Sequence, residues 1–181
     1  MDQLAFIESV LAHVNVTLRD VKTPMTSTGH LEPNPEPVKD NDPAKVREYQ
    51  SAIGSLMYIM LRTCPDLGYV VGRLSQFLAN PSTCHLQAVA HVFGYLAGQK
   101  EQCLVYFDQL GNEFTTQPIG FCDADFAGDP APEEKCCSVS GNIFFLSKGL
   151  ISWSSKKQEI TAKSTMQSEY ISLWYAVSWT W

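Results

Sequence analysis

The sequence is short of the basic residues that nucleic-acid binders usually carry. Among its 181 residues, 13 are lysine or arginine and 19 are aspartate or glutamate, so the formal net charge is −6. Affinity for a phosphate backbone comes mainly from lysine and arginine. This balance argues against a chain that binds nucleic acid unaided. The acidic excess is larger after residue 80, where six basic side chains accompany ten acidic ones.

Targeting and membrane signals are also missing. The amino-terminal run MDQLAFIESVLAHV has no basic start, and no apolar run approaches the ~20 residues of a membrane span. None of the six cysteines forms a CxxC pair, and the four histidines lack the spacing of metal ligands. These absences predict an intracellular protein with reduced thiols and no contact with a membrane.

The first half of the chain has the apolar periodicity of helices. Helical spacing occurs over residues 2–14, 43–63, 66–79 and 83–97. Asp42 and Pro43 form a good helix start, because an N-cap side chain precedes a proline in the first turn. Residues 20–43 differ, since they contain five prolines and few large apolar residues. This segment is predicted to be an extended linker without core residues.

After Gly98 the pattern changes to short strands and one last helix. Strands are expected at residues 103–107, 118–122, 139–146 and 150–155, with 159–163 either extending the last of them or starting another. A hairpin turn is expected at Ser147-Lys148-Gly149, and a helix from Thr165 to the carboxyl end. The order predicts an α+β fold: helices, then an antiparallel β-meander, then a helix.

Residues 120–129 read GFCDADFAGD and contain three aspartates directly after a short apolar run. An aspartate at the end of a strand is rigid enough to bind a divalent cation such as Mg²⁺. A glutamate on a helix that crosses the sheet can supply a further oxygen ligand, and Glu169 lies on such a helix. Acidic loops after strands are common, however. From these residues alone, a metal site and a solvated loop both remain open.

Three further segments accompany GFCDADFAGD in a fixed order. They are YQSAIGSLMYIMLRTCPDLGYVVGRLSQFLANPSTCHLQAVAHVFGYLAG (49–98), SVSGNIFFLSKGLISWSSKKQ (138–158) and STMQSEY (164–170). Together the four resemble the pol polyprotein of copia-type LTR retrotransposons. In that family, corresponding segments include YSDADWAGD, I-S-W-S-S-K-K-Q and S-T-E-A-E-Y. Each motif alone is weak, but the combination is highly specific.

The resemblance implies the tail of a reverse transcriptase followed by the front of a ribonuclease H domain. Residues 1–19 would be a helix of the reverse transcriptase tail, 20–43 a proline-rich linker, and 44–100 a helical thumb- or connection-like region. Residues 101–181 would be a partial ribonuclease H-like domain, a truncated antiparallel β-meander plus helix. The intact parent would copy RNA into DNA and cleave the RNA strand of an RNA–DNA hybrid.

The resemblance also assigns roles to acidic residues. Asp123 and Glu169 would be catalytic residues and ligands of Mg²⁺, whereas Asp125 and Asp129 would have structural or loop-forming roles. Two carboxylates of the family's usual four are present, the polymerase signature tyrosine–x–aspartate–aspartate is absent, and Gln167 replaces a family glutamate. We therefore expect an incomplete site, no tightly bound Mg²⁺, and no activity of the chain alone.

A second interpretation is a domesticated or decayed remnant that acts as an interaction module without enzymatic activity. Its features would be an open sheet edge, through which the chain could self-associate, and exposed tryptophans near the carboxyl end. Lys156 and Lys157 are open to two interpretations: contacts to a nucleic-acid backbone, or a solvated strand end.

Overall fold

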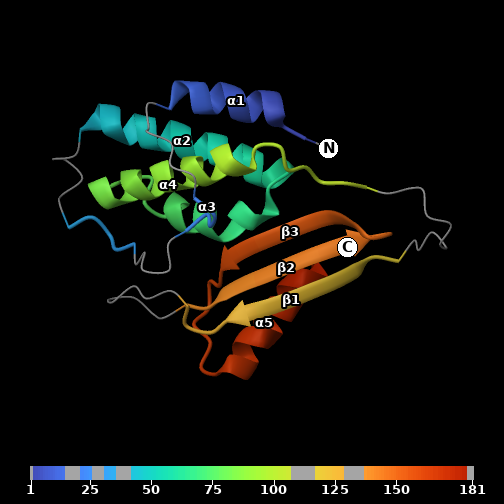
Figure 1. Ribbon diagram of the computed structural model, residues 1–181. Helices are drawn as coiled ribbons and strands as arrows, with labels where there is room; N and C mark the ends of the chain where they lie inside the picture. The colour runs from blue at the N-terminus through green and yellow to red at the C-terminus, as the bar shows by residue number, and fades with distance from the viewer. Residues whose placement is uncertain are drawn as a thin grey trace. The chain divides into compact units, whose positions relative to one another are not determined.

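The computed structural model describes residues 2–14, 21–25, 31–35, 42–106, 117–128 and 137–178. In these ranges the chain forms five α-helices and a three-stranded antiparallel sheet, which confirms the predicted α+β class (Figure 1). The chain divides into two compact units, Met1–Cys103 and Leu104–Trp181. No helix in the described ranges is both long and apolar enough to cross a membrane.

The first unit is helical. Its elements are α1 (Leu4–His13), α2 (Pro43–Arg62), the short 3₁₀ helix η2 (Pro65–Leu67), α3 (Gly68–Ser75) and α4 (Thr83–Gln99). Helix α2 begins as predicted, because the Asp42 side chain accepts a hydrogen bond from the Ala44 amide directly before the helix. The helix predicted over residues 66–79 is interrupted. After α3 the backbone amides bond to the carbonyl three residues back, as Phe77 N does to Leu74 O, and the helix ends in a run of turns.

Large apolar side chains from α2, α3 and α4 form the core of this unit. Its largest fully buried members include Tyr49, Ile53, Leu56, Leu74 and Phe93. Leu31 also belongs to this core, although it lies in the proline-rich stretch that was predicted to contribute no core residues. An Arg73 Nη2 donates to the Leu31 carbonyl over 3.2 Å, so the extended chain is held at this point.

The second unit is a sheet covered on one face by a helix. Strands β1 (Ile119–Asp125), β2 (Val139–Leu146) and β3 (Gly149–Lys157) are antiparallel in the order β1-β2-β3, and α5 (Thr165–Ser178) follows. Figure 1 shows α5 across one face of this sheet. The predicted hairpin between β2 and β3 is present as a two-residue turn, in which Ser147 and Lys148 have φ values of 46° and 68°.

Two strand predictions in this region were wrong for the described residues. Residues 103–106 form no strand. The Tyr106 hydroxyl donates to the Leu150 carbonyl over 2.7 Å, so this segment is held by a side-chain hydrogen bond and not by backbone pairing with a strand. Residues 159–163 form no strand either. The Lys163 amide donates to the Gln167 side chain on α5, so this stretch is bonded to the first turn of the helix and not to a strand.

Helix α5 packs on the sheet through small residues. Ser168, Ser172 and Ala176 are its buried residues, and their spacing of four places them on one side of the helix. The sheet face beneath them is also partly polar, because Ser140 and Asn142 are buried there. Small residues on both sides allow the helix backbone to come close to the strands.

Candidate functional site

Asp123 lies on β1, at the edge of the sheet. It pairs with Gly141 of β2, and strand alternation puts its side chain on the same face as Phe121 and Ile143. This face is opposite to the one that α5 covers. A Cβ built on Gly141 meets nothing within 4 Å, so the space beside the exposed Asp123 carboxylate is open.

Glu169 comes close to the same edge from α5. The Ser172 hydroxyl, three residues further along the helix, donates to the Asp123 carbonyl over 2.7 Å. Glu169 is exposed, and no strand of the described residues pairs with the outer side of β1. The two acidic residues expected to act together are therefore on contacting elements. The Asp123 side chain, however, lies on the face of the sheet opposite to α5, the helix that carries Glu169.

Carboxylate oxygens are the ligands that Mg²⁺ prefers. As carboxylates, Asp123 and Glu169 are suitable ligands for Mg²⁺. Two carboxylates are too few for a complete site, and the described residues contain no group of three or more potential metal ligands. Asp125 follows on β1, and its carboxylate lies where a Cβ on Gly128 would stand, so a larger residue at position 128 would displace this side chain. Asp129 lies outside the described residues.

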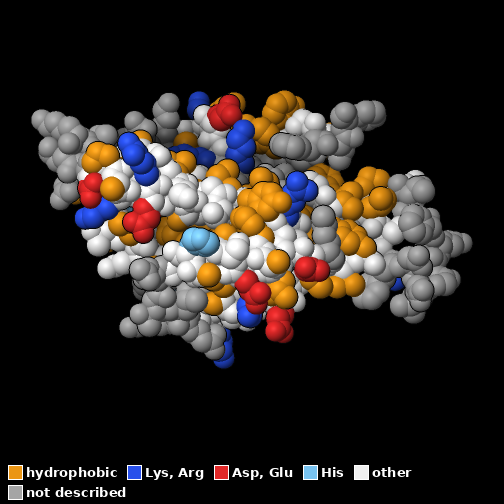
Figure 2. Space-filling model, turned by 90° about the horizontal axis from the view of Figure 1, so that it is seen from above, with side chains coloured by type: hydrophobic (Ala, Val, Ile, Leu, Met, Phe, Trp, Pro, Cys, Tyr) orange, Lys and Arg blue, Asp and Glu red, His pale blue; other side chains and the backbone are white. Residues whose placement is uncertain are grey.

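The two lysines at the end of β3 lie on different sides of the sheet. Strand alternation places Lys156 and Lys157 on opposite faces of the sheet. The Lys156 ammonium lies 5.5 Å from the centre of the Tyr175 ring and 3.3 Å from the Glu159 carboxylate. Lys156 therefore already has partners within the protein. Among the described residues on the face drawn in Figure 2, Lys and Arg are scattered between apolar and acidic side chains and form no continuous basic surface.

A polar network beneath α5 was missed by the sequence analysis. Gln158, directly after β3, is 1% exposed, and its Nε2 donates to both the Ser140 hydroxyl and the Ser168 carbonyl over 2.9 Å. The signal in the sequence was the repeat of small residues every four positions on α5. That repeat indicates a close contact with a neighbour, but it does not say with which one.

The outer side of α5 is apolar and exposed. Its large apolar residues are between 47% and 67% exposed, namely Met166, Tyr170, Leu173, Trp174 and Val177. Exposure of Trp174 was expected from the sequence, whereas Trp179 and Trp181 lie outside the described residues. Large apolar residues on the outer side of a helix, with serines on the buried side, are the reverse of the usual pattern for a helix facing water.

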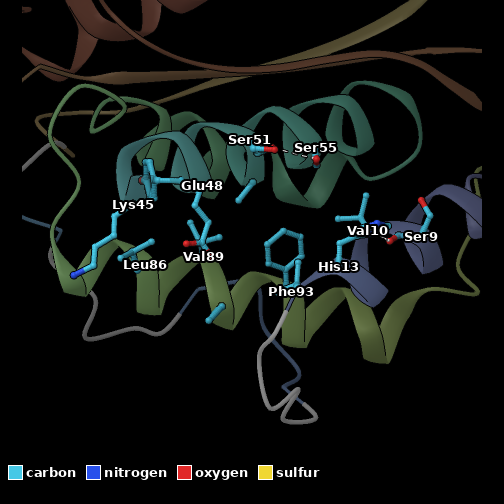
Figure 3. Close-up of a pocket in the computed structure, with 14 residues that line it drawn as sticks. Ser9, Val10, His13, Lys45, Glu48, Ser51, Ser55, Leu86, Val89 and Phe93 are labelled. Atoms are coloured by element: carbon cyan, nitrogen blue, oxygen red, sulfur yellow. Dashed lines mark hydrogen bonds between the residues drawn. The ribbon is translucent and has the colours of Figure 1, made fainter. Parts of the chain in front are cut away.

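The first unit contains a cavity of about 620 Å³ between α1, α2 and α4 (Figure 3). Three of its polar side chains already bond to backbone carbonyls: His13 to Ser9, Ser55 to Ser51, and Tyr49 to Leu74. None of these three is directed into the cavity as an unsatisfied group. Lys45 and Glu48 also line the cavity and carry opposite charges, so the lining does not select the charge of a ligand.

The fold and this edge describe an α+β protein with two acidic residues, Asp123 and Glu169, on a strand and a helix that are in contact. The chain is 38% identical over 178 residues to the retrovirus-related Pol polyprotein from transposon TNT 1-94 of Nicotiana tabacum, covering 94% of this chain and 12% of that protein. It is 37% identical over 174 residues to the corresponding polyprotein of transposon RE1 of Arabidopsis thaliana, covering 96% of this chain and 11% of that protein.

A much shorter relative is the secreted RxLR effector protein 161 of Plasmopara viticola. The two are 42% identical over 125 residues, which is 69% of this chain and 83% of the effector. This chain corresponds to a fragment of the retrovirus-related Pol polyproteins of transposons, and it spans about an eighth of their length. No family model and no solved structure matches the chain.

Proposed function

We propose that the chain is the part of a copia-type Pol polyprotein that joins the end of the reverse transcriptase to the beginning of ribonuclease H. The intact polyprotein would synthesise DNA on an RNA template and cleave the RNA of the resulting hybrid, with Mg²⁺ as the cofactor. In this chain, Asp123 and Glu169 would be two of the metal ligands. The observation that carries the proposal is the contact of β1 with α5 at Asp123.

The chain by itself would be inactive in hybrid cleavage. Two-metal hydrolysis requires carboxylates that can hold and bridge two ions about 3.5–4 Å apart. The described residues contain no group of three or more potential metal ligands, and the Asp123 side chain lies on the face of the sheet opposite to α5, the helix that carries Glu169. Binding of the hybrid would also depend on other parts of the polyprotein, because this chain carries a net charge of −6.

The test is cleavage of a labelled RNA–DNA hybrid by the purified chain in the presence of Mg²⁺. We expect no cleavage above that of Asp123→Asn, which preserves the size of the side chain but removes its charge. Cleavage that requires Mg²⁺ and disappears in Asp123→Asn would overturn the proposed inactivity and would establish a complete site.

A second candidate function is an interaction module without catalysis. A specific observation favours it: most of the length of the Plasmopara viticola effector corresponds to this stretch, so such a sequence can occur as a short protein. The open edge of β1 and the apolar outer side of α5 are the surfaces available for contacts.

Size-exclusion chromatography with light scattering distinguishes this candidate. Self-association through β1 would give an apparent mass that rises with protein concentration, and a lysine in place of exposed Phe121 on β1 would reduce it. A monomer at all concentrations would argue against self-association of the chain.

A further inference from the structure

We propose that Gln158 and Ser172 are positioning residues, which hold the peptides of Asp123 and Glu169 in a fixed relation. Their relevance to catalysis rests on the proposed function, in which those two acidic residues are metal ligands. The contacts themselves are independent of any metal. They link three strands and a helix around one buried polar cluster.

Gln158 holds the first turn of α5. Its amide nitrogen donates to the Ser168 carbonyl over 2.9 Å, and this carbonyl belongs to the peptide bond that leads into Glu169. The same nitrogen donates to the Ser140 hydroxyl on β2 over 2.9 Å. The Gln158 backbone is fixed in turn, because its N–H donates to the Ser138 carbonyl over 2.8 Å.

Ser172 holds β1. Its hydroxyl is 2.7 Å from the carbonyl of Asp123, which belongs to the peptide bond between Asp123 and Ala124. Ser172 is 1% exposed, so this bond is protected from competing water. Because Ser168 and Ser172 are one turn apart on the same helix, the two contacts act on one rigid segment.

The contacts form a closed circuit. Asp123 pairs with Gly141 in the ladder, and the adjacent Ser140 receives the bond from Gln158. Gln158 bonds to Ser168, and α5 leads to Ser172, which returns to Asp123. A strand or helix could shift only by breaking a member of this circuit, so neither acidic residue can move independently of the other.

The buried carbonyl oxygen of Gln158 strengthens the argument. Gln158 Oε1 has no hydrogen-bond partner among the described residues, although both partners of Nε2 are in place. The amide must point this way, because the Ser168 carbonyl can only accept. An apolar side chain of similar size would avoid the unsatisfied oxygen. The advantage of a glutamine at position 158 is therefore the two hydrogen bonds that its Nε2 donates.

The experiment is NMR spectroscopy of the ¹⁵N-labelled full chain, in wild type and four variants. Gln158→Met removes both donors, Ser172→Ala removes the hydroxyl, and Ser172→Thr keeps it. Ser178→Ala is the matched control, because the Ser178 hydroxyl bonds only within α5, to the Tyr175 carbonyl. The readouts are the amide shifts and hydrogen-exchange rates of Ala124 and Glu169.

We expect Gln158→Met and Ser172→Ala, which each remove hydrogen-bond donors, to affect the amide signals of both Ala124 and Glu169. Gln158→Met should shift the Ala124 signal, although Gln158 does not touch that peptide, and Ser172→Ala should shift that of Glu169. Exchange at Glu169 should become about fivefold to tenfold faster in both deletions, as expected for one lost hydrogen bond. Ser172→Thr should restore the wild-type values, and Ser178→Ala should leave them unchanged.

Two results would overturn the proposal: shifts that remain confined to the neighbours of the substituted residue, or exchange that accelerates equally throughout the second unit. If Gln158→Met does not fold, Gln158→Glu provides the same test. Its neutral carboxyl can donate one bond and its carboxylate none, so protection at Glu169 should rise as pH falls. Protection that does not depend on pH would contradict the role of Gln158.

Titration of the wild type with Mn²⁺ separates this proposal from the proposed function. Selective broadening of the Asp123 and Glu169 signals at millimolar Mn²⁺ would support their role as metal ligands. If no broadening occurs while the two deletions still affect both sites, the metal role fails and the positioning role stands.

Discussion

His85 is fully buried at the start of α4, where its environment disfavours a charge. Its Nδ1 accepts a hydrogen bond from the Ser82 amide over 2.9 Å, and its ring stacks on Phe77 at a centroid distance of 3.9 Å. Burial lowers the pKa of His85, and the Arg73 charge adds to this. The Glu32 backbone acts in the opposite direction, but Nε2 makes no well-formed hydrogen bond with the described residues.

We therefore predict that acid destabilises the first unit through His85. The unfolded chain takes up a proton near the ordinary pKa of about 6.5, whereas the folded chain does not, so stability falls as pH decreases below that value. Urea unfolding at pH 7.5 and pH 5.5, followed by circular dichroism, measures this. The drop should be smaller in His85→Gln and unchanged in the exposed-site control His13→Gln. An equal drop in all three proteins would contradict it.

Tyr95 gives the corresponding behaviour in alkali. Burial raises its pKa to about 12, and its hydrogen bond to the Asp66 carboxylate, 2.6 Å long, acts in the same direction. The unfolded tyrosine loses its proton near pH 10. Stability should therefore fall as pH rises from about 10 to about 12.

The pH dependence of urea unfolding between pH 8.5 and 11 tests this second prediction. Tyr95→Phe should flatten the decline only in part, because burial also raises the pKa of Tyr49. If Tyr95→Phe has the same slope as the wild type, Tyr95 does not govern this range.

At the residue scale, sequence reasoning found the acidic residues but not what holds them. Asp123 and Glu169 were recognisable because they belong to motifs. Their supports were not, since Ser172 contacts a residue 49 positions away and Gln158 is a polar residue inside the protein. Such contacts depend on how the helix packs on the sheet, which periodicity does not reveal. Whether the pair binds Mg²⁺ stays a prediction.

At the scale of elements, hydrophobic periodicity was reliable where an element buries one side. Strands β2 and β3 and helices α2 and α4 lie close to their predicted positions. The misses have local causes. The segment 103–106 is apolar enough for a strand but has no ladder partner among the described residues, and α3 ends early because its last amides bond three residues back.

The hairpin between β2 and β3 offers a test at this scale. Lys148 has a φ of 68°, in a turn of the type that favours glycine. Lys148→Gly should remove this strain and stabilise the second unit by about 1 kcal/mol. Urea unfolding followed by tryptophan fluorescence measures the change. As the control, Lys157→Gly within β3 should destabilise the unit, and stabilisation by both substitutions would refute the role of the turn.

At the scale of the whole molecule, the two units differ in their cores. The first unit buries many large aliphatic and aromatic side chains. In the described part of the second unit, the buried apolar residues are Cys137, Phe144, Ala162 and Ala176, and the remaining buried positions are polar apart from Gly149. Since stability rises with buried apolar area, the second unit should be the weaker one.

We therefore predict two unfolding transitions. All four tryptophans lie in the second unit, whereas helices α1 to α4 dominate the far-ultraviolet circular dichroism. On heating, tryptophan fluorescence should change before the helical signal does. Coincident transitions by the two probes would show that the units unfold cooperatively.

The apolar outer side of α5 has a consequence for how this region could acquire function. Glu169 lies on the same helix, one position before the exposed Tyr170. Any polypeptide that covers this apolar surface must come within the diameter of a helix, roughly 10–12 Å, of the Glu169 carboxylate. If that polypeptide carried carboxylates of its own, a single docking event would both cover the apolar surface and bring further potential metal ligands close to Glu169.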